Sequence, residues 1–214
     1  MRTIVHADPF SMITALEKLD LSVPILHRAV ESGYLAKANA TPNHPPLYPS
    51  FVAWGDTICS LRNELIPRGW SKTNERNWPR VIHPSGEIAL TVATGNEHTG
   101  SPNFMPATKS TKGPSTIQAI EINRNQGWLP GFEPELDALE KLDDEQPVTW
   151  ILLVHFAQNE IRCELSLPIS SNEEGRVVLW GERILLPSVP LDPEIVDIIP
   201  PQIPDIDVQI TRKL

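Results

Sequence analysis

The run Trp150-Ile-Leu-Leu-Val-His-Phe156 decides the fold that we predict for this chain. An almost continuous apolar run of this length is typical of a strand that is covered on both faces. The turn Ala157-Gln-Asn-Glu160 leads into Ile161–Leu167, where apolar and polar residues alternate as in a half-buried antiparallel strand. Two more strands are expected, at Val177–Trp180 and at Ile184–Leu186. We predict that these segments pair into one sheet.

A β-hairpin is predicted before this sheet, in the segments Arg80–His83 and Glu87–Ala93. The short stretch Pro84-Ser-Gly86 joins the two strands. Along the second strand Ile88, Leu90 and Val92 alternate with Glu87, Ala89 and Thr91, which predicts one buried face.

Helices are predicted to dominate the first third of the chain. Asp8-Pro9 and Ser22-Val-Pro24 combine a capping residue with an early proline, a typical helix start. Ser50 is predicted to cap a third helix, whose apolar stripe faces the core and consists of Phe51, Trp54, Ile58, Leu61 and Leu65. A shorter helix is expected after a cap at Ser115, where a strand is the alternative, and another is expected from Pro134.

The predicted fold class is therefore α+β, with N-terminal helices packed on a largely antiparallel sheet. We expect a single domain over residues 1–186 and a proline-rich, acidic tail over residues 187–214. The tail contains Ile206-Asp-Val-Gln-Ile210, which alternates like a strand that can add to the edge of a sheet. The alternative is a loosely held terminus.

Charge is unevenly distributed along the chain, whose formal net charge is −9. Residues 1–61 carry four Lys/Arg against five Asp/Glu, residues 62–124 carry eight against five, and residues 125–214 carry six against seventeen. The corresponding net charges are −1, +3 and −11. The whole chain is thus a poor non-specific binder of polyanions, whereas its middle third can present a basic face.

The two cysteines, Cys59 and Cys163, fall on faces predicted to be buried, which favours reduced core thiols. We find no signal peptide and no apolar run long enough for a membrane span, so we expect no membrane association and a cytoplasmic location. Walker, dinucleotide-binding, hydrolase-elbow and structural-zinc motifs are absent, so we predict no cofactor and no metal.

The long polar segment after the hairpin contains Thr94-Gly-Asn-Glu-His-Thr-Gly100 and Lys109-Ser-Thr-Lys-Gly-Pro-Ser115. Segments of this length with little regular structure are usually either functional or disordered in a compact domain. Glu97 and His98, with Lys112 nearby, are weak catalytic candidates for a metal-assisted hydrolase or nuclease. The acid-x-lysine spacing of such enzymes is missing, so we lean against an enzyme.

Nucleic-acid binding is a second hypothesis, because cations and tryptophans alternate between Arg68 and Arg80. The alternative is that Trp70 and Trp78 close the hydrophobic core while the cations are simply exposed. The candidate contacts are Arg68, Lys72, Arg76, Arg80, Lys109, Lys112 and Arg124.

The preferred hypothesis is a non-catalytic interaction or accessory subunit that binds a protein partner. It rests on the proline-rich arm Thr41–Pro49, on the tail and on the lack of a catalytic constellation. The sequence does not identify the partner.

Overall fold

The computed structural model describes residues 3–125 and 146–191. The helices are α1 (Pro9–Glu17), α2 (Val23–Ala38), α3 (Tyr48–Leu65) and α4 (Pro114–Asn125), with short 3₁₀ turns η1 (Ile66–Arg68) and η2 (Glu75–Asn77). The strands are β1 (Ile4–His6), β2 (Ser71–Thr73), β3 (Arg80–Ile82), β4 (Ile88–Thr94), β5 (Val148–Phe156), β6 (Glu160–Ser171), β7 (Val177–Leu185) and β8 (Val189–Pro190).

All eight strands join one mixed sheet in the order β1-β7-β6-β5-β4-β3-β2, and β8 pairs with β6 beyond the end of β7. The pairings β1–β7 and β4–β5 are parallel, and the other five are antiparallel. The α+β class, the single sheet and its largely antiparallel character are therefore confirmed. The two strands predicted at Val177–Trp180 and Ile184–Leu186 are parts of one strand, β7.

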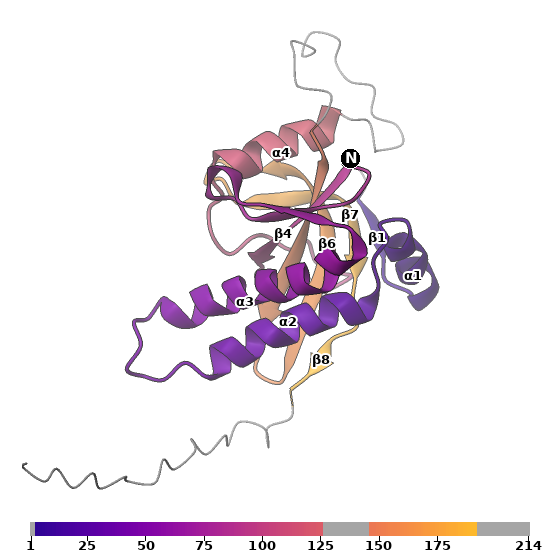
Figure 1. The fold of residues 1–214 in the computed structure, drawn as a ribbon. Coiled ribbons are helices and arrows are strands. Elements are labelled where there is room, and N and C mark those ends of the chain that lie inside the picture. Colours follow the sequence, from indigo (N-terminus) through magenta and orange to yellow (C-terminus); the bar gives the residue numbers. More distant parts are fainter. Residues whose placement is uncertain (1–2, 126–145, 192–214) are drawn as a thin grey trace, which may run out of the picture.

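The helices cover both faces of the sheet (Figure 1). Helices α1, α2 and α3 bury the larger core, in which Leu26 and Leu65 meet Leu152 and Leu165 of the central strands. On the opposite face, Ile120 of α4 packs with a smaller group that includes Trp180. The central strands thus lie inside a three-layer arrangement, as the apolar composition of β5 predicted.

The prediction that β4 and β6 are half-buried is wrong. Thr91 of β4 and Glu164 and Ser166 of β6, all predicted on the polar face, are 5%, 0% and 0% exposed. The reason is that α4 and the segment 95–113 cover the face on which an open sheet would meet water. Each of these three side chains finds a partner, as for Thr91, whose hydroxyl donates to the carbonyl of Pro79.

Helices α2 and α3 form a hairpin that approaches unusually closely at Gly33. A Cβ at Gly33 would stand 2.5 Å from the carbonyl oxygen of Ala53 and would overlap the side chain of Thr57. The hairpin extends beyond the core, because no residue from 34 to 52 is buried (Figure 1). Phe51, predicted to face the core, is consequently 66% exposed, and Cys59 is also exposed rather than buried.

The beginning of the predicted tail lies against the domain. The carbonyl of Pro187 contacts the ring of His27 at 2.9 Å, and Leu191 donates its N–H to Asn159. The helix predicted after Pro134 and the strand-like end at Ile206–Ile210 fall outside the described residues. Among the helices that the structure describes, none is both long and apolar enough to cross a membrane.

Candidate functional site

The long segment 95–113, which the sequence singled out, is fastened to the end of the sheet by its backbone. Gly95 donates to Val154 of β5, Lys109 donates to Thr94, and Gly95 and Thr108 form a β-bridge. The side chain of Asn96 accepts hydrogen bonds from the N–H groups of His98 and Ala107 and so closes the loop on itself. The segment is therefore a packed part of the domain.

A buried ion pair anchors this segment to the sheet. Arg183 of β7 donates from Nε to Oε1 of Glu164 at 2.9 Å and from Nη2 to Oε2 at 2.6 Å, with both side chains almost fully buried. Both side chains also form hydrogen bonds with the backbone of the loop. The guanidinium donates to the carbonyls of Ser101 and Phe104, and the carboxylate accepts the N–H of Gly100.

The sequence did not predict this pair, because alternation assigned Glu164 to the solvent face and Arg183 falls between the strands predicted at Val177–Trp180 and Ile184–Leu186. The available signal is that opposite charges stand on the same side of two adjacent strands. The Glu164 carboxylate also accepts the hydroxyl of Ser166, so it is fully occupied by internal donors. These contacts give the pair a structural task, which is to hold the loop.

The catalytic candidates Glu97 and His98 lie on the outer side of the loop. Their closest charged atoms, Oε1 and Nε2, are 3.8 Å apart, and the Glu97 side chain is 71% exposed. The His98 ring stacks on Phe104 with 5.0 Å between centroids. Lys112 donates from Nζ to the hydroxyl of Ser110, and burial lowers its pKa. In the described part of the chain, no three His, Cys, Asp or Glu side chains are grouped as ligands for a metal ion.

Of the seven basic candidates for nucleic-acid contact, the structure brings Arg76 and Arg80 into one pocket. Arg68, Lys72, Lys109 and Arg124 are exposed on four different segments. The two tryptophans of the segment Arg68–Arg80 also lie in different places. Trp70 is buried in the main core, as the structural alternative predicted, and Trp78 lines the pocket.

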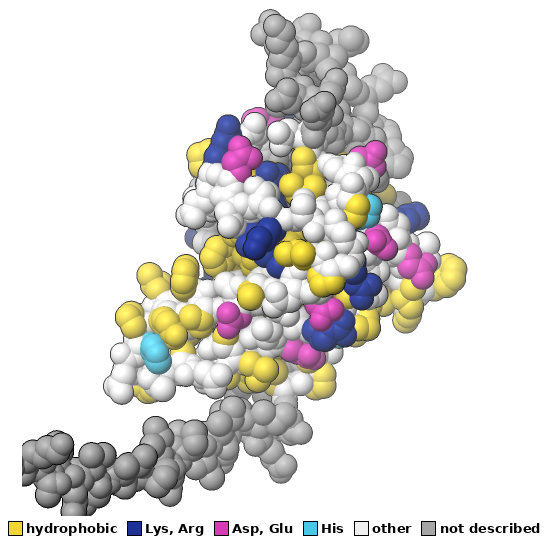
Figure 2. Space-filling model, viewed as in Figure 1, with side chains coloured by type: hydrophobic (Ala, Val, Ile, Leu, Met, Phe, Trp, Pro, Cys, Tyr) yellow, Lys and Arg dark blue, Asp and Glu magenta, His cyan; other side chains and the backbone are white. Residues whose placement is uncertain are grey.

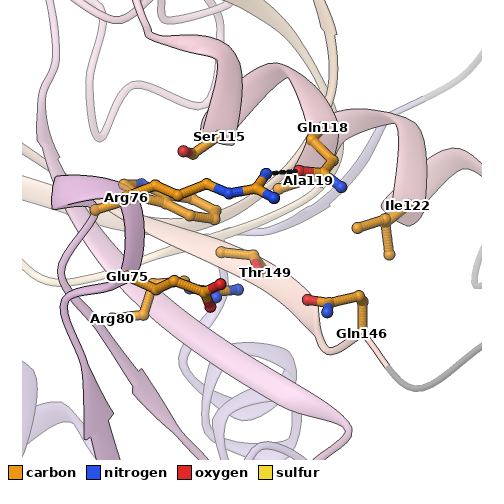
Figure 3. Close-up of a pocket in the computed structure, with 10 residues that line it drawn as sticks. Glu75, Arg76, Arg80, Ser115, Gln118, Ala119, Ile122, Gln146 and Thr149 are labelled. Atoms are coloured by element: carbon orange, nitrogen blue, oxygen red, sulfur yellow. Dashed lines mark hydrogen bonds between the residues drawn. The ribbon is translucent and has the colours of Figure 1, made fainter. Parts of the chain in front are cut away.

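The pocket lies between the η2 turn, β3 and the start of α4, and has a volume of about 60 Å³ (Figure 3). Arg80 enters from β3 with its guanidinium 4.5 Å from the centre of the Trp78 ring. Arg76 enters from the turn and donates from Nη1 to Oε1 of Gln118 on α4 at 2.9 Å. Glu75, Ser115 and Thr149 are further polar residues in the wall of the pocket.

The turn that carries this pocket is held in an unusual conformation. Arg76 and Asn77 both have left-handed backbones, with φ of 52° and 57°. Such residues cost free energy and are concentrated at functional sites. Arg62 of α3 fixes the turn by donating from Nη2 to the carbonyl of Thr73 and to the side chain of Asn74. The turn at the pocket is therefore held in place by contacts within the domain.

A second surface feature is the end of the α2–α3 hairpin, residues 34–52, which we call the apolar tip. Leu47 is 81% exposed, Phe51 66%, Leu35 48% and Tyr48 38%. Figure 2 shows apolar side chains gathered at this end of the hairpin. Residues 38–55 contain no Asp, Glu, Lys or Arg. The sequence predicted a helix here, but the predicted cap at Ser50 is wrong, because α3 begins at Tyr48. The first residue of the predicted core stripe, Phe51, is exposed.

One cation–π contact and two contacts between aromatic rings stabilise the apolar tip. The Lys37 ammonium group lies 5.0 Å from the centre of the Phe156 ring, and burial lowers the pKa of Lys37. The rings of His44 and Tyr48 stack at 4.2 Å, and the rings of Phe51 and Trp54 are 6.0 Å apart.

No protein-family model, no curated protein and no solved structure matches this chain.

Proposed function

We propose that this protein is a non-catalytic interaction subunit that binds a partner protein through the apolar tip. The observation that carries the proposal is the pair of large apolar side chains, Leu47 and Phe51, held in water on a projecting helical hairpin. They are four residues apart, so they lie on one side of the first helical turn. Exposed apolar clusters of this kind mark interaction sites.

The chemistry of the tip favours a protein over other partners. Nucleic acids and anionic membrane surfaces are bound through Lys and Arg, and residues 38–55 contain neither. Leucine and aromatic side chains instead match an apolar groove on another protein, where aromatic anchors supply much of the binding free energy. The expected partner surface is therefore an apolar groove with few charges.

The hairpin suits this task because its base is rigid. Close packing at Gly33 joins α2 to α3, and Arg28 of α2 donates twice to the carboxylate of Glu64 of α3, each time at 2.7 Å. A preformed projecting element loses little conformational entropy when it binds.

A photo-crosslinking amino acid at position 51, expressed in native cells, tests the proposal. The matched control carries the same amino acid at position 10, because Phe10 is equally apolar and is 81% exposed on α1. We expect one protein to be crosslinked from position 51 and not from position 10, and to bind the unmodified chain when both are purified. Crosslinking between two copies of this chain, or equal products from both positions, would overturn the proposal.

A further inference from the structure

We infer that the pocket between η2, β3 and α4 binds a singly charged oxyanion, a carboxylate or a phosphodiester group. The inference shares no residue with the apolar tip and is independent of it. Its starting point is Arg80, which is 9% exposed, lines the pocket, and has no carboxylate within ion-pair distance in the part of the chain that the structure describes.

The Arg80 guanidinium is short of hydrogen-bond partners. Its Nε–H is enclosed and unpaired, and no side-chain hydrogen bond from Arg80 is present among the described residues. Burial lowers the pKa of Arg80, while the charge of Glu75 partly offsets this effect. The face of Trp78 contributes a cation–π contact but accepts no classical hydrogen bond. Buried donors are normally satisfied. Arg62 Nε, Arg162 Nε, Trp70 Nε1 and Thr99 Oγ1 also lack a hydrogen-bond partner within the described ranges, but among these residues it is Arg80 that lines the pocket, where an acceptor can reach its guanidinium.

The surroundings of Arg80 define the class of that acceptor. Arg76 and Arg80 contribute two positive charges and Glu75 one negative charge, which leaves one positive charge facing the pocket. A monoanion balances that charge, whereas the dianion of a phosphate monoester would not. Arginine also matches oxyanions geometrically, because its planar donors address two oxygens at once.

The walls add neutral donors and limit the size of the ligand. Ser115 lines the pocket with a hydroxyl, and Gln118 keeps its amide nitrogen after accepting from Arg76 (Figure 3). Thr149 also lines the pocket, but its hydroxyl already donates to the carbonyl of Pro147. A volume of about 60 Å³ admits one oxyanion group and leaves the rest of the ligand outside. Charge-assisted hydrogen bonds at a water-accessible site predict millimolar affinity for the isolated group.

The test is an NMR titration of the full chain with dimethyl phosphate and, separately, with acetate. We follow the Nε–H signal of Arg80 and the backbone N–H signals of Ser115 and Thr149. A saturable shift of all three with either probe is expected, and the tighter probe distinguishes a phosphodiester from a carboxylate. Chloride at matched ionic strength controls for salt.

Variants decide whether Arg80 is responsible. Arg80→Met should abolish the saturable shifts at Ser115 and Thr149, whereas Arg68→Met, at an exposed site outside the pocket, should leave them unchanged. Arg80→Lys keeps the charge and loses the paired donors, so it should weaken binding at least several-fold even if Arg80→Met does not fold. No saturable shift with either probe, or equal shifts in the Arg80→Lys protein, would overturn the inference.

Discussion

Removal of both partners of the Glu164–Arg183 ion pair should destabilise the protein by less than the sum of the two single removals. In Arg183→Met the Glu164 carboxylate stays buried with hydrogen bonds from Gly100 and Ser166 but no counter-charge. In Glu164→Leu the guanidinium keeps only the carbonyls of Ser101 and Phe104. Each single variant therefore leaves an unpaired charge at a site that is 0–1% exposed.

The magnitude follows from the cost of burying a charge without a partner. Breaking a buried pair costs about 3–5 kcal/mol, whereas replacing both members by apolar residues is often nearly neutral. Here the double variant Glu164→Leu/Arg183→Met also leaves the loop groups that the pair now contacts without hydrogen-bond partners. Each such group costs about 1 kcal/mol of stability. We therefore expect about 3–5 kcal/mol for each single variant, no more than about 5 kcal/mol for the double variant, and a coupling of at least about 1 kcal/mol.

Urea unfolding of the wild type, both single variants and the double variant measures this coupling. Glu174→Gln is the control, because its ion pair with Arg176 is exposed and should have little measurable effect. Trypsin provides a second readout. Loss of the anchor should speed cleavage after Lys109 and Lys112 in the loop that the pair holds. Additive free energies in the double variant would refute the proposed role of the pair.

Three further predictions concern packing, thiol exposure and pH. Gly33→Ala should lower the free energy of unfolding in urea by about 1–3 kcal/mol, because the added methyl group would meet the backbone of α3. Gly55→Ala, with open space around it, should raise the free energy of unfolding by about 0.5–1 kcal/mol. Equal effects of the two variants would contradict the close helix contact. Cys59 should react with a thiol reagent in the native protein and Cys163 only after unfolding, since Cys163 is buried and burial raises its pKa to about 12; two fast thiols would contradict this. Burial lowers the pKa of His155, so the stability that its neutral form contributes is present above the ordinary value of 6.5 and is lost as the pH falls below it. Between about pH 7.5 and about pH 5.5, the His155→Gln protein should therefore lose less stability than the wild type. An equal loss in both proteins would count against this prediction.

Sequence patterns predicted most elements of the fold because apolar periodicity reflects burial directly. The apolar run of β5 and the turn into β6 have the expected form, and α4 begins next to the predicted cap at Ser115. Periodicity fails where one strand face is covered by another part of the chain. Glu164 alternates as a solvent-facing residue would, yet the segment 95–113 covers it.

The candidate sites were less predictable, since they depend on how far elements extend and on which distant residues meet. Phe51 has the spacing of a core residue, and only the overhang of the hairpin exposes it. Arg76 and Arg80 were among seven basic candidates that sequence alone could not rank. A left-handed turn and the start of α4, more than thirty residues later, bring these two into one pocket.

The most direct test of the account is the dissociation constant of the crosslinked partner for three forms of the purified chain. Wild type is compared with Leu47→Ser/Phe51→Ser and with the control Phe10→Ser, which removes a ring on α1 that is even more exposed than that of Phe51. If the tip is the binding surface, the double variant binds at least about 10-fold more weakly, equivalent to about 1.4 kcal/mol, and the control binds like wild type. Equal dissociation constants for all three forms would contradict it.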